Sequence, residues 1–107
     1  RVVTMNILDD IRILDFTRVL AGPFASMIMA DLGAEVIKVE EPRTGDEARG
    51  FGPFVNGQSA YFTSINRGKQ SIGIDLRTEA GRDLARDLAG RCDVLIENFR
   101  PGTMARF

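Results

Sequence analysis

The sequence contains no histidine and no tryptophan, and it has only one cysteine and one tyrosine. Without histidine, neither histidine general-base chemistry nor a histidine–metal site is encoded within these residues. The single cysteine, Cys92, excludes an internal disulfide and is typical of a protein from a reducing compartment. We therefore expect a cytoplasmic protein without a metal.

Long apolar runs and an excess of basic charge are also missing. No stretch approaches the roughly 18 apolar residues of a transmembrane helix. The acidic pair Asp9 and Asp10 stands where a secretory signal would have its apolar region. The sequence has 14 Lys and Arg residues and 15 Asp and Glu residues, which gives a formal charge of −1. It therefore lacks the excess of basic residues that nucleic-acid binding normally requires. We expect neither a membrane nor a nucleic-acid partner.

The residues that are present suit one small domain with a single core. The chain has 107 residues, of which 44% are hydrophobic. Its ends look cut, because Arg1 is not a start residue, Met5 is a candidate initiator, and residues 101–107 resemble the first turn of a helix. We expect residues 1–107 to be the N-terminal portion of a larger domain.

The first 40 residues have the pattern of a strand, a helix and a second strand. Residues 12–16 carry apolar side chains at both parities, which is typical of a strand covered on both faces. Pro23 suits the first position of a helix that ends at Gly33, and the scarcity of polar residues between them predicts burial almost all round. Residues 35–40 alternate with period two and predict the second strand.

A long loop precedes the second half of the pattern. Residues 41–59 are rich in Gly and Pro and predict an extended loop, followed by one or two helical turns at residues 61–66. Residues 71–76 predict a strand, Thr78 is a good N-cap for a helix that ends at Gly90, and residues 93–96 predict a last short strand. The fold class is therefore α/β, an open parallel sheet with helices on both faces.

In such sheets ligands bind outside the carboxyl ends of the strands. Four segments lie there, namely residues 17–21, 40–42, 75–77 and 97–102. Arg77, Arg100 and Arg106 follow strand ends, where guanidinium groups can clamp phosphates, and Asn98 and Phe99 stand beside them. The sequence has no P-loop and no G-x-G-x-x-G after its first strand, which argues against the usual mode of NAD binding.

Other conspicuous residues have ordinary structural explanations. Asp15, at a strand end, is better explained by hydrogen bonds to loop amides than by catalysis. Cys92 adjoins an apolar strand and has no histidine to activate it, so we interpret it as a small buried hydrophobe. Arg82, Arg86 and Arg91 fit the solvated face of a helix.

Four stretches together resemble the N-terminal part of the family III CoA-transferases, a group that includes formyl-CoA transferase, the carnitine CoA-transferase and the α-methylacyl-CoA racemases. They are LDFTRVLAGPFASMIMADLGAEVIKVEEP, GDEAR, YFTSINRGKQSIGIDLRT and DVLIENFRPG. The resemblance covers residues 8–107 in the expected order, and VLIENFRPG after a strand is its most specific part. It implies a Rossmann-like, CoA-binding domain.

The resemblance also implies which residues bind CoA. These are Leu20, Ala21, Ile74, Asp75, Leu76, Arg77, Asn98, Phe99, Arg100 and Arg106. Glu41 is a departure, because formyl-CoA transferase has an arginine there that faces the nucleotide. Arg43 is near enough to replace it.

The activity implied by the resemblance is transfer of CoA from an acyl-CoA thioester to an acceptor carboxylate. In the family, an aspartate nucleophile forms a mixed anhydride and then an aspartyl-CoA thioester, and that aspartate lies beyond this chain. The family also implies a homodimer of interlocked chains, and we expect residues 1–107 alone to be inactive. An acyl-CoA racemase of the same family and a noncatalytic nucleotide-binding α/β module remain the alternatives.

Overall fold

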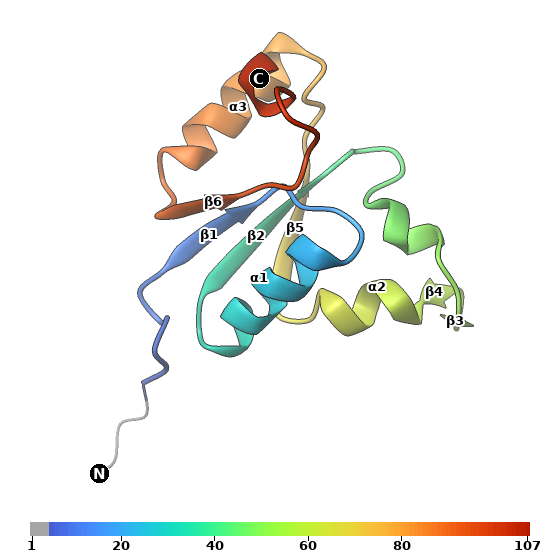
Figure 1. The fold of residues 1–107 in the computed structure, drawn as a ribbon. Coiled ribbons are helices and arrows are strands. Elements are labelled where there is room, and N and C mark those ends of the chain that lie inside the picture. Colours follow the sequence, from blue (N-terminus) through green and yellow to red (C-terminus); the bar gives the residue numbers. More distant parts are fainter. Residues whose placement is uncertain (1–4) are drawn as a thin grey trace.

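A four-stranded parallel sheet forms the centre of the molecule (Figure 1). The computed structural model describes residues 5–107. Arg1, from which we predicted a cut N-terminus, lies outside the described residues. The strands are β1 (Arg12–Asp15), β2 (Glu35–Glu40), β5 (Lys69–Gly73) and β6 (Val94–Ile96), in the order β5-β2-β1-β6. Every neighbouring pair in this sheet is parallel.

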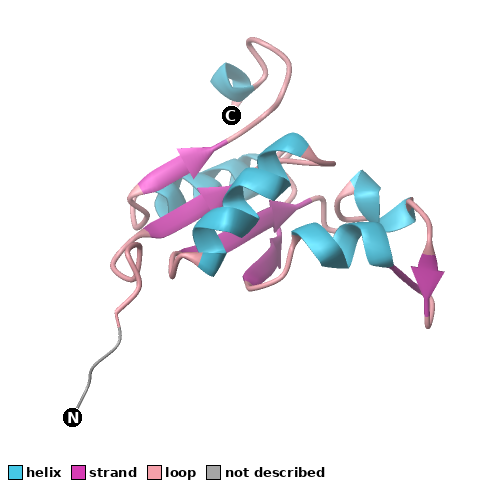
Figure 2. Ribbon diagram, turned by 60° about the horizontal axis from the view of Figure 1, so that its bottom comes forward, coloured by secondary structure: helices cyan, strands magenta, loops and turns pink. Residues whose placement is uncertain are grey.

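Helices cover both faces of the sheet, as the α/β interpretation predicts (Figure 2). Helix α1 (Ala21–Asp31) connects β1 to β2 on one face, with α2 (Ala60–Ile65) beside it, and α3 (Glu79–Ala89) lies on the other face. Thr78 caps α3 as predicted, since its side chain accepts a hydrogen bond from the Gly81 amide at 3.0 Å. The predicted fold class is thus confirmed.

The predicted loop at residues 41–59 has more structure than its composition indicates. It contains a 3₁₀ helix, η1 (Glu47–Gly50), and a small hairpin of β3 (Phe54–Val55) and β4 (Gln58–Ser59). Asn56 and Gly57, with φ of 52° and 77°, form the hairpin turn, which requires two left-handed residues. The prediction of a continuous loop was wrong because short hydrogen-bonded elements leave no periodicity.

Several element boundaries also differ from the sequence prediction. Helix α1 begins at Ala21, two residues before Pro23. Strand β5 ends at Gly73 rather than at residue 76, since pairing with β2 ends where Glu40 meets Gly73. The final segment forms one 3₁₀ turn, η2 (Met104–Arg106), in place of an α-helical turn.

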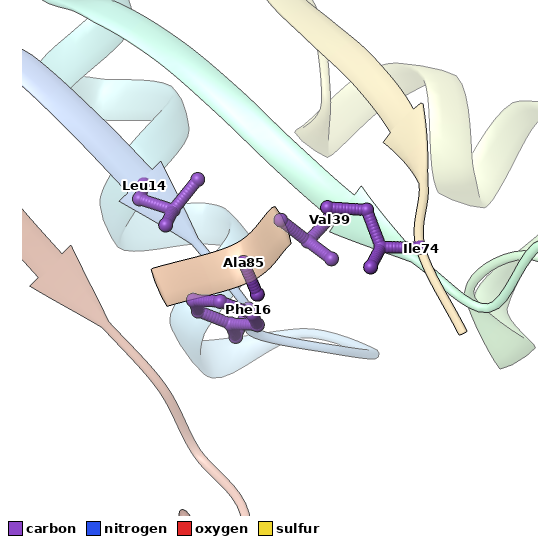
Figure 3. Packing of buried hydrophobic residues seen from close by; sticks show 5 residues of the cluster. All are labelled: Leu14, Phe16, Val39, Ile74 and Ala85. Atoms are coloured by element: carbon purple, nitrogen blue, oxygen red, sulfur yellow. The ribbon is translucent and has the colours of Figure 1, made fainter. Parts of the chain in front are cut away.

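The main hydrophobic core lies between the sheet and α3. Leu14, Phe16, Val39, Ile74 and Ala85 form it, each at most 6% exposed (Figure 3). They come from β1, from β2, from the residues that follow β1 and β5, and from α3. A smaller cluster of buried side chains packs beneath α1. Its members are Ile13, Ala34 and Val36.

Helix α1 is not buried all round, contrary to the sequence prediction. Leu20, Phe24, Ile28 and Leu32 recur every fourth residue and are 43–49% exposed. The opposite side of α1 is buried through Pro23, Ser26 and Met27. A nearly continuous apolar run gives no helical periodicity, so the sequence does not indicate which face meets the sheet.

Candidate functional site

A cavity of about 350 Å³ opens at the carboxyl edge of the sheet. The four segments expected at this edge all contribute to its wall, together with η1 and the C-terminal turn. Chain order also reverses here, because β1 lies between β2 on one side and β6 on the other. Open α/β sheets bind ligands at such a switch point.

Arg77 lies at the mouth of this cavity and forms a two-pronged contact with a carboxylate. Its Nε donates to Oδ1 of Asp75 at 3.0 Å, and its Nη2 donates to Oδ2 at 3.1 Å. Nη2 also lies 3.8 Å from Oε1 of Glu41. The side chain is 62% exposed, and the two bonds to Asp75 use only two of the five guanidinium donors, so donors remain for an anionic ligand.

Glu41 lies between two arginines at this mouth. Its carboxylate accepts from the Thr44 amide at 2.7 Å and from Nε of Arg43 at 2.8 Å, and these bonds lower its pKa to about 2. It is therefore ionised at neutral pH. Arg43, the residue suggested as a replacement for a basic group at position 41, lies at the same edge and binds Glu41.

Arg18 is a residue of the site that the sequence interpretation did not single out. Its guanidinium carbon lies 5.3 Å from the centroid of the Phe99 ring, within the range of a cation–π contact, and Nη1 is 3.6 Å from Oε1 of Glu47. Its side chain is 51% exposed and lines the cavity. Arg18 could have been predicted as a site residue, because it lies in residues 17–21, one of the four segments expected at the carboxyl edge.

The Asn98 side chain connects the segment after β6 to the β1–α1 loop through two hydrogen bonds. Its Oδ1 accepts from the Arg18 amide at 3.0 Å, and its Nδ2 donates to the Arg18 carbonyl at 2.9 Å. The side chain thus fixes the β1–α1 loop against the segment after β6. Beside it, Phe99 lines the cavity and contacts the rings of Phe16 and Phe107, with centroids 6.4 and 6.0 Å away.

The other residues proposed for CoA binding divide into two groups. Ile74, Asp75 and Leu76 line the cavity beside Arg77. The second group contributes nothing to the cavity wall and consists of Leu20, Ala21, Asn98, Arg100 and Arg106. Arg106 bonds Thr103 at 3.4 Å. The structure brings the first group together and leaves the second on the surrounding surface.

Asp15 is fully buried and surrounded by donors. It accepts from the Thr17 amide at 2.7 Å and from the Ser26 hydroxyl at 2.5 Å, and Nζ of Lys69 lies 3.4 Å away. The structural interpretation of Asp15 is confirmed by these bonds. Burial lowers the pKa of Lys69 to about 8, although the charge of Asp15 opposes that shift.

The remaining conspicuous residues, one cysteine and three arginines, make packing contacts, ion pairs or hydrogen bonds within the fold. Cys92 is half-buried against the α3 core, and burial raises the pKa of its thiol. Arg86 and Arg91 form exposed pairs with Asp83 and Asp87, as a solvated face predicts. Arg82 differs, because its guanidinium donates to the Leu76 carbonyl at 3.2 Å.

None of the helices in residues 5–107 combines the length and the apolar character needed to cross a bilayer. Within the same range, no group of three His, Cys, Asp or Glu side chains is arranged to hold a metal ion.

Comparison with known proteins gives consistent matches. The mouse succinyl-CoA:glutarate CoA-transferase is 52% identical over 103 residues, which are 95% of this chain and 24% of the relative. The acetyl-CoA:oxalate CoA-transferase of Acetobacter aceti is 48% identical over 98 residues, 92% of this chain and 25% of the relative. A crystal structure of a CAIB/BAIF family protein from Brucella suis superimposes with a TM-score of 0.88 at 45% identity, covering 96% of this chain and 28% of that one.

The matches extend along almost the whole chain, which spans about a quarter of the length of these relatives. The model of CoA-transferase family III matches residues 8–107. That range includes all four segments at the carboxyl edge and every described strand of the parallel sheet. The chain belongs to family III of the CoA-transferases.

Proposed function

We propose that this chain forms the CoA-binding edge of an enzyme that moves CoA from an acyl-CoA thioester to a carboxylic acid. Residues 1–107 are the N-terminal portion of its Rossmann-like domain. The nucleophile, an aspartate carboxylate that attacks the thioester carbonyl, lies outside this chain. The residues present bind and orient CoA.

The observation that carries the proposal is the composition of the cavity at the carboxyl edge. Arg77 and Arg18 supply guanidinium groups at its mouth, and Phe16, Leu76 and Phe99 supply apolar wall. CoA has charged phosphates at its nucleotide end and an uncharged amide arm at the other. Such a ligand requires cations at one end of its site and backbone donors with apolar walls along the rest.

The acceptor is a small dicarboxylic acid in this proposal. The mouse relative bears the name of a glutarate transferase, and the Acetobacter relative that of an oxalate transferase. Among the described residues, the other cation that lines the cavity is Lys38, and its ammonium group is already paired with Asp46. The acceptor pocket is therefore assigned to residues outside 5–107, and a homodimer completes the enzyme.

The test uses the full gene product, succinyl-CoA and glutarate or oxalate, with the CoA thioesters separated by liquid chromatography. We expect transfer to the acceptor. Arg77→Ala should raise KM for succinyl-CoA about tenfold and leave kcat within twofold, because the residue contacts the non-reacting end of the substrate. Arg91→Ala is the matched control, an exposed arginine paired with Asp87 away from the cavity.

Three results would contradict parts of the proposal. An unchanged KM in Arg77→Ala removes that residue from the phosphate site. Epimerisation of a 2-methylacyl-CoA without transfer identifies the protein as the racemase instead. Binding of CoA without either reaction supports the noncatalytic module.

A further inference from the structure

The loop between β1 and α1 contains a strained residue. Val19 has φ of 72°, in the left-handed region that β-branched side chains strongly disfavour. Neighbouring Arg18 points its guanidinium at the cavity, and Ala21 begins α1. A valine persists in this conformation only where its surroundings impose it.

A buried ion pair lies directly beneath this loop. Nζ of Lys38 is 2.8 Å from Oδ2 of Asp46, and the two side chains are 1% and 0% exposed. Lys38 comes from the middle of β2, and Asp46 precedes η1. A salt bridge with no access to water is a costly way to gain stability, because both ions lose their hydration. Its position under the loop indicates another role.

Both members of the pair hold the backbone of the loop. Nζ of Lys38 donates to the Thr17 carbonyl at 2.9 Å. The carboxylate of Asp46 accepts from the Val19 amide, at 3.1 Å for Oδ1 and 3.3 Å for Oδ2. Lys38 and Asp46 therefore fix the loop on either side of Arg18, at the left-handed residue itself.

Asp46 is in turn held in place by its own neighbours. Its backbone amide donates to Oε1 of Glu40 at 2.8 Å, and its Oδ1 also accepts from the Ala48 amide at 2.9 Å. The carboxylate cannot follow the loop if the loop relaxes. The geometry is that of a rigid clamp acting on a strained segment.

We propose that Lys38 and Asp46 are positioning residues, which hold Val19 in the left-handed conformation so that Arg18 and the loop peptides face the CoA site. The inference rests on the proposed function for its consequence, namely CoA affinity. The two residues act through the loop backbone, since their own side chains are closed to solvent. A glycine at position 19 would adopt the same conformation without the clamp.

A glycine at position 19 therefore tests the role of Lys38 and Asp46. In the full gene product, Asp46→Asn should raise KM for acyl-CoA about tenfold, and adding Val19→Gly should bring KM back to within threefold of the unmodified protein. Val19→Gly exchanges a strained left-handed valine for a residue that adopts this conformation freely, so it can also restore stability, and a role in stability alone is tested by a destabilising variant elsewhere. Val36→Ala, which weakens the smaller core at the amino end of β2, should leave KM unchanged, and a tenfold rise there would mean that lost stability alone raises KM.

A second readout needs no CoA at all. The backbone amide of Arg18, observed by ¹⁵N–¹H NMR, should shift in Asp46→Asn and return in the double variant, because that amide donates to Asn98. An unshifted Arg18 amide, or a KM that Val19→Gly fails to restore, overturns the positioning role. An amide that shifts and returns while no variant binds CoA supports the positioning role and overturns the proposed function.

Asp46→Asn leaves Lys38 buried without a counter-charge, so a variant without any buried charge is also needed. Lys38→Met combined with Asp46→Leu replaces the pair by apolar side chains, an exchange that folded proteins often tolerate. This variant also removes the bond to the Val19 amide. We expect the same tenfold rise in KM and the same recovery on adding Val19→Gly, and no recovery would again contradict the inference.

Discussion

The two faces of the central sheet differ although the same strands supply both. On the α3 face, β1 and β2 contribute Leu14 and Val39 to an apolar core. On the α1 face, the side chains at the start of these strands are apolar. Toward the carboxyl edge they are the charged residues Asp15, Lys38 and Glu40, all at most 6% exposed. Alternation along each strand assigns neighbouring residues to these opposite environments.

The difference separates two tasks of the fold. Burial of apolar area on the α3 face stabilises the chain without directional demands. The charged groups on the α1 face make directional bonds to loop backbones, such as Lys38 to the Thr17 carbonyl and Asp15 to the Thr17 amide. The α3 face therefore supplies the larger apolar core, and the α1 face gives the cavity loops a defined shape.

The largest expected effect belongs to the apolar face. Leu14→Ala should lower the free energy of unfolding by about 3–4 kcal/mol, because Leu14 is fully buried and its truncation leaves a cavity. Urea denaturation followed by circular dichroism measures the change. Leu84→Ala on α3, where the side chain is 49% exposed, is the control and should cost less than about 1 kcal/mol. Equal losses would contradict the conclusion that buried apolar contacts stabilise this face.

The next effect is a pH dependence on the charged face. Burial opposes ionisation of Glu40, but bonds from Arg49, Ser71 and the Asp46 amide outweigh it and lower its pKa to about 2. A carboxyl with a lower pKa in the folded state stabilises the protein above its unfolded pKa of about 4.3. This stability, about 2–3 kcal/mol, is lost as pH falls from about 4.3 to 2.

Denaturation at pH 6, 4 and 2.5 measures this loss, and Glu40→Gln removes the titrating group. The variant should be less stable at pH 6 and should lose less on acidification than the unmodified protein. Parallel pH profiles of the two proteins would mean that Glu40 is not the group responsible.

The smallest effect is expected from the adjacent residue. Glu41 also has a pKa of about 2, yet its side chain is 35% exposed against 4% for Glu40. Glu41→Gln should leave the urea midpoint unchanged, because an exposed ion pair adds little. In the proposed function it should strengthen CoA binding about threefold by freeing donors of Arg77 and Arg43, which titration calorimetry measures. If Glu41→Gln lost as much stability as Glu40→Gln, the contribution of these carboxylates to stability would depend on their charge and not on their burial.

Much of the fold follows from local patterns in the sequence. Alternation at residues 35–40 predicts β2, and Thr78 with the apolar spacing after it predicts α3, both confirmed by the structure. The exposed face of α1 and the hairpin at residues 54–59 were not predicted. An all-apolar helix has no directional signal, and two-residue strands are too short for a period.

The candidate site was predictable in place but not in detail. The rule for parallel sheets indicates the carboxyl edge, and Arg77 lies there at the mouth of the cavity. The contact of Arg77 with Glu41 and the cation–π contact of Arg18 with Phe99 were not predictable, because Glu41 and Phe99 are distant in sequence from the arginines that they contact.

By itself the sequence determined the four strands of the parallel sheet, the helices between them and the α/β class, since each depends on local spacing, and the class in turn indicated the carboxyl edge as the candidate site. The tertiary structure decided which charges meet. Nothing in the alternation of β2 pairs Lys38 with Asp46, and the residue type at position 19 argues against a left-handed conformation there. Both features arise because folding encloses two opposite charges beneath a loop, where water cannot replace the bonds that they make to each other and to its backbone.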